Sequence, residues 1–307
     1  MSRKQCVESA LPASHNANYV NVFEHRRRRQ SNNRQNLMSD QERRAKFEQL
    51  IRRYEINKTF ASKLGALDGY EIVFICDDSD SMNTELSDVS GPYEKAPTRW
   101  DELKQTVSIV IDLASIFDPD GVDVYFLNRE PMYNKACYTY LFNKISIVKI
   151  ISGPTPMVRV LRQVLKEKKN QIQERKLLIF LATDGVPTDD NGQPRIDELR
   201  QFLLEERKPI NQISVTIIAC TDDNECMSYL NNWDKIIPNL DVIDDYRSEK
   251  KEILACQGRS FPFSYGDYVV KILMGGIDPW FDALDEKQIT TDEYGRSEPR
   301  MTTNNNF

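Results

Sequence analysis

Five short apolar runs separated by stretches of helical periodicity limit the folds that are open to this chain. Each run is rich in β-branched or aromatic residues and is largely apolar throughout, rather than at every second position. Such runs are typical of strands buried on both faces, as in parallel sheets covered by helices. We therefore predict an α/β fold with a doubly wound, mainly parallel sheet and helices on both faces. The runs are Glu71–Cys76, Val122–Leu127, Leu177–Ala182, Ile213–Ala219 and Leu240–Ile243, and a further short strand is expected at Tyr138–Phe142.

Capping residues and helical periodicity place helices between these runs. Ser39 is followed three residues later by Glu42, and Thr98 by Asp101. In such a pair each side chain satisfies a backbone N–H of the other residue at the start of a helix. Pro156 suits the first turn of another helix, because its φ is already close to the helical value. Further helices are expected at Arg195–Glu206 and at Tyr265–Leu284, the latter broken at Gly275–Gly276 and at Pro279.

Charge divides the chain into a basic N-terminal arm and an acidic body. Residues 1–58 hold 13 Lys and Arg against 6 Asp and Glu, whereas the whole chain has a net charge of −6. The first 38 residues are polar with few large apolar side chains, a composition typical of disorder. The predicted order is a disordered basic arm (1–38), an N-terminal helical extension (39–68), a central α/β domain (69–246), a C-terminal helical extension (247–288) and a disordered tail (289–307).

Apolar stripes indicate that both helical extensions pack on the central domain. Without a partner these side chains would face water, and each contributes about 1.5–3 kcal/mol when fully buried. The stripes are formed by Phe47, Leu50, Ile51 and Tyr54 in the first extension and by Val269, Ile272 and Leu273 in the second.

The composition argues against several functional classes. The apolar runs are shorter than the about 20 residues that span a bilayer, so we expect no membrane insertion. His15 and His25 are the only histidines and lie in the arm, which argues against histidine-dependent catalysis or zinc binding. The acidic body would repel phosphates, so we do not expect nucleic-acid binding. We expect a reducing, cytoplasmic location. Arg26–Arg29 can be interpreted as a nuclear or nucleic-acid signal, or as a solvated basic linker.

Polar residues gather where two of the predicted strands end. The sequence Asp77-Asp78-Ser79-Asp80-Ser81 follows the first run, and Thr183-Asp184-Gly185 follows Leu177–Ala182. Thr155, placed at the N-cap of a predicted helix, should lie on the same rim. Open α/β sheets bind ligands at this rim, and carboxylate and hydroxyl oxygens suit a hard cation such as Mg²⁺. We therefore predict a divalent-cation site (Mg²⁺ or Mn²⁺) at the carboxyl ends of these strands.

With these three segments the chain resembles the von Willebrand factor type A (VWA) domain family over roughly Tyr70–Tyr246. The family signature is a metal-ion-dependent adhesion site, Asp-x-Ser-x-Ser followed by a distant Thr and a distant Asp. The matching residues here are Asp77, Ser79 and Ser81, then Thr155, then Asp184. The flanking stretches Tyr54–Asn57 and Gly266–Leu273 are similar to intracellular proteins that carry this domain and that imply no known activity.

The resemblance implies a Rossmann-like fold and a role for each matched residue. Asp77, Ser79, Ser81 and Thr155 would contact the metal directly or through water, and Asp184 would act through water. An acidic residue of a partner protein would complete the shell, which implies an interaction module rather than an enzyme. The position between the two serines is commonly Gly in the family and is Asp80 here. That carboxylate either strengthens cation binding and weakens attraction for an acidic partner, or points to solvent and does neither.

Two alternatives to this function are open. The first is a Mg²⁺-dependent phosphatase of the haloacid-dehalogenase type, because Asp78-Ser79-Asp80 forms Asp-x-Asp after a first strand. Against it, Met82 stands where that family expects Thr or Val, and the acidic pair Asp189-Asp190 follows a loop rather than a strand. The second is a VWA scaffold with a vestigial metal site.

Overall fold

The computed structural model describes residues 39–86, 96–118, 121–132, 153–287, 289–291 and 297–299. The predicted basic arm, the strand expected at Tyr138–Phe142 and most of the predicted tail lie outside these residues. In the described part of the chain, no helix is both long enough and apolar enough to cross a lipid bilayer.

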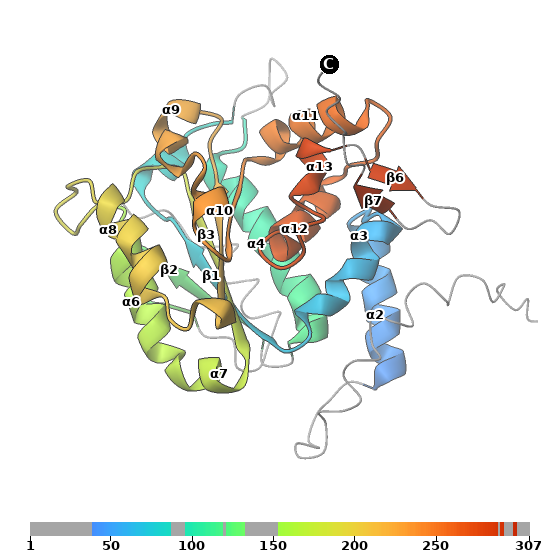
Figure 1. The fold of residues 1–307 in the computed structure, drawn as a ribbon, viewed down its shortest axis with the longest axis horizontal. Coiled ribbons are helices and arrows are strands. Elements are labelled where there is room, and N and C mark those ends of the chain that lie inside the picture. The colour runs from blue at the N-terminus through green and yellow to red at the C-terminus, as the bar shows by residue number, and fades with distance from the viewer. Residues whose placement is uncertain are drawn as a thin grey trace, which may run out of the picture.

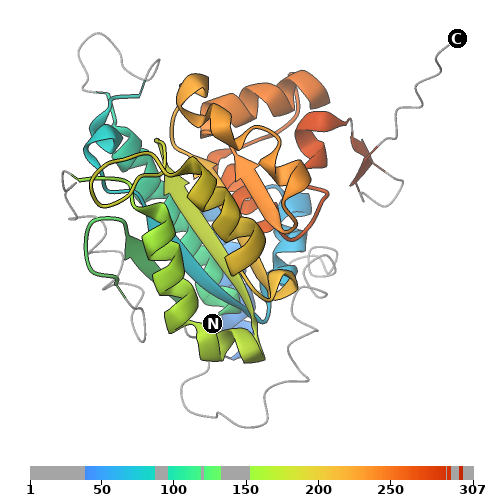
Figure 2. The same cartoon turned by 60° about the vertical axis from the view of Figure 1, so that its left-hand side comes forward.

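Five parallel strands form the central sheet, and each coincides with one of the apolar runs (Figures 1 and 2). Neighbouring strands pair in continuous register, for example Phe74 with Val124 on one side and with Phe180 on the other. The prediction of a doubly wound α/β fold with a parallel sheet is confirmed. The strands are β1 (Tyr70–Cys76), β2 (Val122–Phe126), β3 (Lys176–Thr183), β4 (Ile213–Ala219) and β5 (Leu240–Ile243).

The strand order β2-β1-β3-β4-β5 places a topological switch point between β1 and β3. From β1 the chain crosses to β2 on one side, and it then returns past β1 to form β3 on the other side. The crossover helices therefore leave the carboxyl ends of β1 and β3 in opposite directions, and this is the place at which open α/β sheets bind their ligands. Asp77 and Asp184 are the first residues after these two strands, so the fold places both at the switch point.

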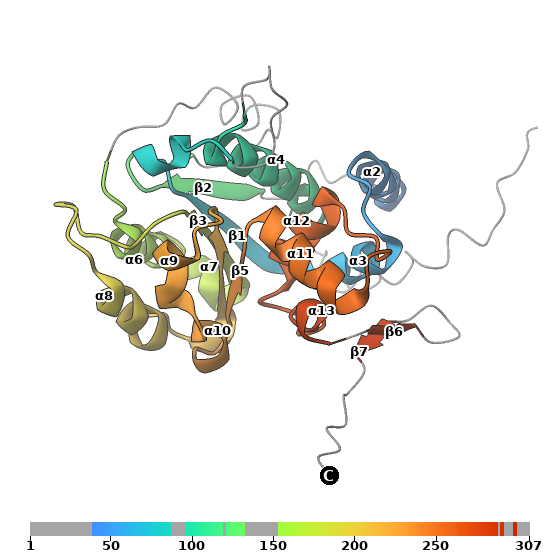
Figure 3. The same cartoon turned by 90° about the horizontal axis from the view of Figure 1, so that it is seen from above.

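Alternate residues of each strand face two separate hydrophobic layers. In β1, Ile72 and Phe74 belong to one layer, whereas Val73 and Ile75 belong to the other. Figure 3 shows helices on both sides of the sheet. The first layer contains α2 (Asp40–Arg53), α3 (Lys58–Lys63), α4 (Arg99–Phe117), α11 (Tyr246–Gln257), α12 (Tyr265–Met274) and α13 (Ala283–Glu286). The second contains α6 (Met157–Glu167), α7 (Lys169–Glu174), α8 (Ile196–Gln201), α9 (Asn224–Met227) and α10 (Trp233–Ile236).

Both predicted extensions pack on the central domain, as the apolar stripes indicated. Phe47 is fully buried in the layer that also contains α4, and Ile272 of α12 is fully buried in the same layer. The two extensions also contact each other, because the Asn57 backbone N–H donates to Asp267 Oδ1 at 2.6 Å. Figure 1 shows α2 and α3 beside α4 and α12. The N- and C-terminal helices are therefore part of one continuous hydrophobic core.

Most predicted helix ends are confirmed, and the differences are local. The capping boxes Ser39–Glu42 and Thr98–Asp101 are both formed. The helix predicted at Arg195–Glu206 is divided into α8 and a π-helical turn, η5 (Phe202–Glu206). The last helical segment is broken as predicted, between α12 and α13. Within the range predicted as a disordered tail, β6 (Ile289–Thr291) pairs antiparallel with β7 (Ser297–Pro299).

Candidate metal centre at the switch point

Asp77 is the innermost residue of the candidate site. Its side chain is fully buried directly after β1, where the backbone is held by a bond from Asp77 N–H to the Ala182 carbonyl of β3 at 2.9 Å. The Ser79 backbone N–H donates to Asp77 Oδ1 at 3.0 Å, and the Thr183 hydroxyl donates to Oδ2 at 2.7 Å. Burial raises the pKa of Asp77 to about 6, although these hydrogen bonds act in the opposite direction. The carboxylate is therefore oriented by neutral donors, without a cationic side chain bonded to it among the described residues.

Two hydroxyls connect the Asp77 loop to the loop after β3. The Ser79 and Ser81 Oγ atoms lie 3.0 Å apart, within hydrogen-bond distance. The Ser81 hydroxyl donates to Asp184 Oδ1 at 2.7 Å, and the Asp184 side chain is fully buried. Four of the five predicted site residues, Asp77, Ser79, Ser81 and Asp184, are thus brought into one hydrogen-bonded group.

Arg99 is a charged member of the site that the sequence analysis did not include. Its Nη1 donates to Asp184 Oδ2 at 2.8 Å, and its Nη2 donates to the Thr221 hydroxyl at 2.7 Å. Its side chain is only 14% exposed. Arg99 is the first residue of α4, where the helix dipole favours anions rather than cations. The sequence does contain one signal for this residue. An arginine directly after a capping threonine stands where the helix dipole disfavours a cation, which indicates an acidic side chain nearby.

Thr155 lies in an adjacent loop but is not bonded to the four-residue group. Its backbone N–H donates to the Thr188 hydroxyl at 2.9 Å, and its carbonyl accepts from the Thr188 N–H at the same distance. Within the described part of the chain, the Thr155 hydroxyl makes no hydrogen bond with Asp77, Ser79, Ser81 or Asp184. Its predicted helix position was wrong by one residue, because Pro156 is the N-cap and α6 begins at Met157. Thr155 therefore precedes the cap, and its backbone is bonded to the loop that follows β3.

Asp78 is held by residues that follow β2. Arg129 Nε donates to Asp78 Oδ2 at 2.6 Å, and the Asn128 backbone N–H donates to Oδ1 at 2.9 Å. Asn128 also donates from its side chain to the Pro154 carbonyl at 2.9 Å. Asp78 thus anchors the Thr155 loop against the end of β1. Asp80, the residue at the departure from the family pattern, is exposed.

The donor set at this site consists of oxygens, which fits a hard cation. It contains the carboxylates of Asp77 and Asp184 and the hydroxyls of Ser79 and Ser81. Across the described ranges, no three or more His, Cys, Asp or Glu side chains are grouped as a metal site. A cation here would consequently rely on hydroxyl oxygen and water for most of its shell, and it would share Asp184 with Arg99. Neither models of protein families nor curated proteins give a match to this chain.

Proposed function

We propose that this protein is an interaction module that binds Mg²⁺ or Mn²⁺ at the switch point and recruits an acidic residue of a partner protein there. The observation that carries the proposal is the group formed by Asp77, Ser79, Ser81 and Asp184, which come from loops about 100 residues apart in sequence. The group lies where open α/β sheets bind ligands. These residues are also the positions at which the chain resembles the VWA adhesion site.

Each residue of the site would contribute differently to cation binding. Asp77 would supply the main negative charge, and Ser79 and Ser81 would supply neutral oxygens. Thr155 would join through its hydroxyl, and Asp184 would act through water while it is bonded to Ser81. Neutral ligands leave the cation with excess positive charge, which favours an incoming carboxylate. Hydroxyl ligands are therefore the chemical basis for recruiting an acidic partner residue.

Isothermal titration calorimetry with Mg²⁺ and with Mn²⁺ tests the metal site directly. Wild type should bind one ion, and Asp77→Ala should abolish the heat because the main charged ligand is lost. Glu174→Gln is a matched control, because Glu174 is an exposed carboxylate at the end of α7 on another part of the surface. Equal heats from wild type and Asp77→Ala would refute the metal assignment, provided that both proteins show a folded thermal transition.

A second candidate function, a scaffold with a vestigial metal site, is favoured by one specific contact. Arg99 already provides a positive charge to Asp184 and joins it to Thr221. In that case the arginine would substitute for the cation and the site would stabilise the loops only. Absence of Mg²⁺ and Mn²⁺ binding in wild type, together with a large loss of stability in Arg99→Ala, would favour this second function.

The phosphatase alternative receives less support from the contacts of Asp78. That mechanism needs Asp78 as a nucleophile, yet its two oxygens accept bonds from Arg129 and from Asn128. A nucleophilic carboxylate engaged in this way is less available to attack a phosphoryl group. Mg²⁺-dependent phosphatase turnover that is lost in Asp78→Asn would nevertheless overturn the interaction-module proposal.

The partner should carry an acidic residue within a basic surface. The described loops around the site are themselves acidic at Glu85, Asp189, Asp190, Asp222 and Asp223. Their field would attract a basic surface, and association should slow as salt is raised. A cytosolic pull-down with and without EDTA tests this, and a partner retained by the metal site should be lost in EDTA.

The free thiols of Cys76, Cys220, Cys226 and Cys256 support a reducing, cytoplasmic location. A nuclear location is the alternative if Arg26–Arg29 acts as a nuclear signal.

A further inference from the structure

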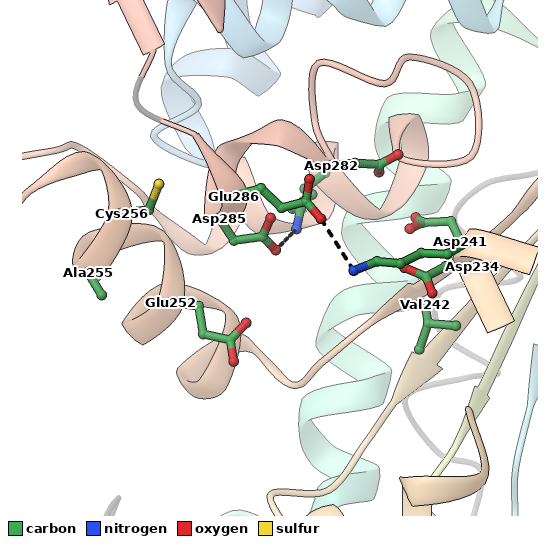
Figure 4. Close-up of a pocket in the computed structure, with 11 residues that line it drawn as sticks. Asp234, Asp241, Val242, Glu252, Ala255, Cys256, Asp282, Asp285 and Glu286 are labelled. Atoms are coloured by element: carbon green, nitrogen blue, oxygen red, sulfur yellow. Dashed lines mark hydrogen bonds and ion pairs between the residues drawn. The ribbon is translucent and has the colours of Figure 1, made fainter. Parts of the chain in front are cut away.

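A cavity lies at the β5 edge of the sheet, between that strand and the C-terminal helices. Its volume is about 640 Å³, within the range of pockets that hold small organic molecules. Its walls are formed by α10, β5, α11, α12 and α13 (Figure 4). The acidic residues in these walls are Asp234, Asp241, Glu252, Asp282, Asp285 and Glu286.

Negative charge in this cavity exceeds positive charge. Two lysines are present, and both are already paired: Lys271 with Glu249 and Asp285, and Lys235 with Glu286 at 3.6 Å. The remaining four carboxylates make no ion pair or hydrogen bond with any residue in the described part of the chain. Because the cavity holds more acidic than basic side chains, it presents a negative potential to a ligand.

Asp241 is an independent indication that a ligand belongs in the cavity. The residue is only 8% exposed, and its Oδ2 has no hydrogen-bond partner. Figure 4 shows its carboxylate directed from β5 toward the helices that close the cavity. Thr216, its register partner on β4, also has a buried hydroxyl without a partner. Burial raises the pKa of Asp241 to about 8, and the nearby charge of Asp282 adds to this effect. The Oδ2 atom itself is covered, because it lies against Gly275 at the end of α12, so a ligand in the cavity would have to donate to the other oxygen of this carboxylate.

The spacing of the carboxylates favours an organic cation over a metal ion. The cavity lies wholly within described residues, and these contain no three acidic, histidine or cysteine side chains grouped around one point as metal ligands. A chain of ammonium groups can meet carboxylates that are spread over several walls, because each ammonium has three donors. Val242 and Ala255 offer apolar contact to the hydrocarbon between such groups.

We propose that this cavity binds an extended organic polycation of the linear polyamine class, with one ammonium group donating to Asp241 and another to Asp282 or Glu252. The site is separate from the switch point, and it does not depend on the metal-dependent function proposed above. Its affinity should increase with the number of ammonium groups and should fall as salt is raised, because the attraction is electrostatic.

Calorimetric titration with spermidine, and with putrescine as a shorter diamine, tests the proposal on the full chain. Wild type should bind spermidine saturably and more tightly than putrescine. Asp241→Asn has nearly the same shape as the native side chain, and it should weaken spermidine binding at least tenfold. Glu252→Gln, on a more exposed helical position, should also weaken it and carries little risk to folding. The matched control Glu174→Gln should bind as wild type does, and so should Asp77→Ala.

Several results would overturn the proposal. One is the absence of saturable spermidine binding, and another is equal affinity in wild type, Asp241→Asn and Glu252→Gln. Displacement of spermidine by one equivalent of Mg²⁺ or Ca²⁺ in the Asp77→Ala protein would show a metal site in the cavity instead. Absence of Mg²⁺ binding in wild type with intact spermidine binding would refute only the metal-dependent function.

Discussion

Arg99 and Asp184 form an ion pair of 2.8 Å between the start of α4 and the end of β3, and both side chains are largely buried. A cation that enters the switch point therefore meets a carboxylate whose other oxygen already accepts from a guanidinium. The positive charge of Arg99 raises the cost of placing a second cation nearby, so this residue should limit the affinity for metal.

Replacing Arg99 by Gln should strengthen Mg²⁺ binding. Removal of the competing charge should lower the dissociation constant about tenfold, which corresponds to about 1.4 kcal/mol. Calorimetric titration measures this change. Arg195→Gln provides the control, because Arg195 forms an exposed pair with Asp189 on the loop beyond β3. Weaker metal binding in Arg99→Gln than in wild type would mean that the arginine organises the site rather than competing with the ion.

Arg207 is fully buried and should be important for stability. Its guanidinium donates to the carbonyl groups of Ile213, Pro238 and Asn239, which lie at the starts of β4 and β5. Burial lowers the pKa of Arg207 to about 10, so the side chain still carries its charge at neutral pH. Arg207→Met should reduce the free energy of unfolding by about 3 kcal/mol, because buried carbonyl groups lose their donors. Urea denaturation measures the loss, and the exposed Arg200→Met of α8 should change stability little.

The pH dependence of stability should show the effect of ionising the buried Asp241 carboxyl group. Burial raises its pKa in the folded protein to about 8, above the ordinary value of 3.8. Between these two values the folded state holds the proton that the unfolded state has released, so this residue lowers stability as pH rises through that range. Above about pH 8 the full cost of a buried carboxylate is present. Asp241→Asn should therefore be more stable than wild type at pH 9, on the order of 2 kcal/mol, with the difference shrinking toward pH 4.

Thermal and urea unfolding of both proteins across this pH range provide the check. Burial also raises the pKa of Asp282 to about 6 and that of Glu249 to about 7. The stability of the variant should therefore still depend on pH to some extent. A constant stability difference between the two proteins from pH 4 to pH 9 would contradict the assignment to Asp241.

Gly266 should be required for docking of the N-terminal extension. A Cβ at this position would overlap the Tyr54 carbonyl oxygen at the end of α2. Gly266→Ala should therefore cost about 1–3 kcal/mol through overpacking, even though alanine favours helices. It should also speed limited proteolysis at Arg52, which is protected if the extension stays docked. Gly185→Ala is the control, because open space surrounds that position. Wild-type cleavage rates at Arg52 in Gly266→Ala would show that the contact is dispensable.

The elements predicted from local patterns are confirmed where the pattern was strong. Continuous apolar runs identify β1 and β3 because nearly every position of a strand buried on both faces must be apolar. The Ser39 and Thr98 capping boxes were predicted because both partners lie within four residues. Helix α11 lies almost wholly within the predicted C-terminal helical extension (247–288), but its bounds were not predicted, since only Glu249 and Ile253 of its residues are buried and no apolar stripe marks it. The π-helical turn after α8 likewise has no local signature in the sequence.

The sequence by itself determined the parallel sheet and the short polar motif after β1. Because the carboxyl ends of parallel strands lie at one edge of a sheet, it also predicted that Asp184 lies near Asp77. These features depend on periodicity and on residue type within a few positions. Only the tertiary structure decided that Arg99 pairs with Asp184, that Arg129 pairs with Asp78, and that Thr155 is bonded to Thr188 instead of to Asp77. The acidic cavity behind Asp241 is also a product of the tertiary structure, because its walls come from five elements. Contacts of this kind join residues far apart in sequence, and their geometry is set by how helices pack on the sheet rather than by any local pattern.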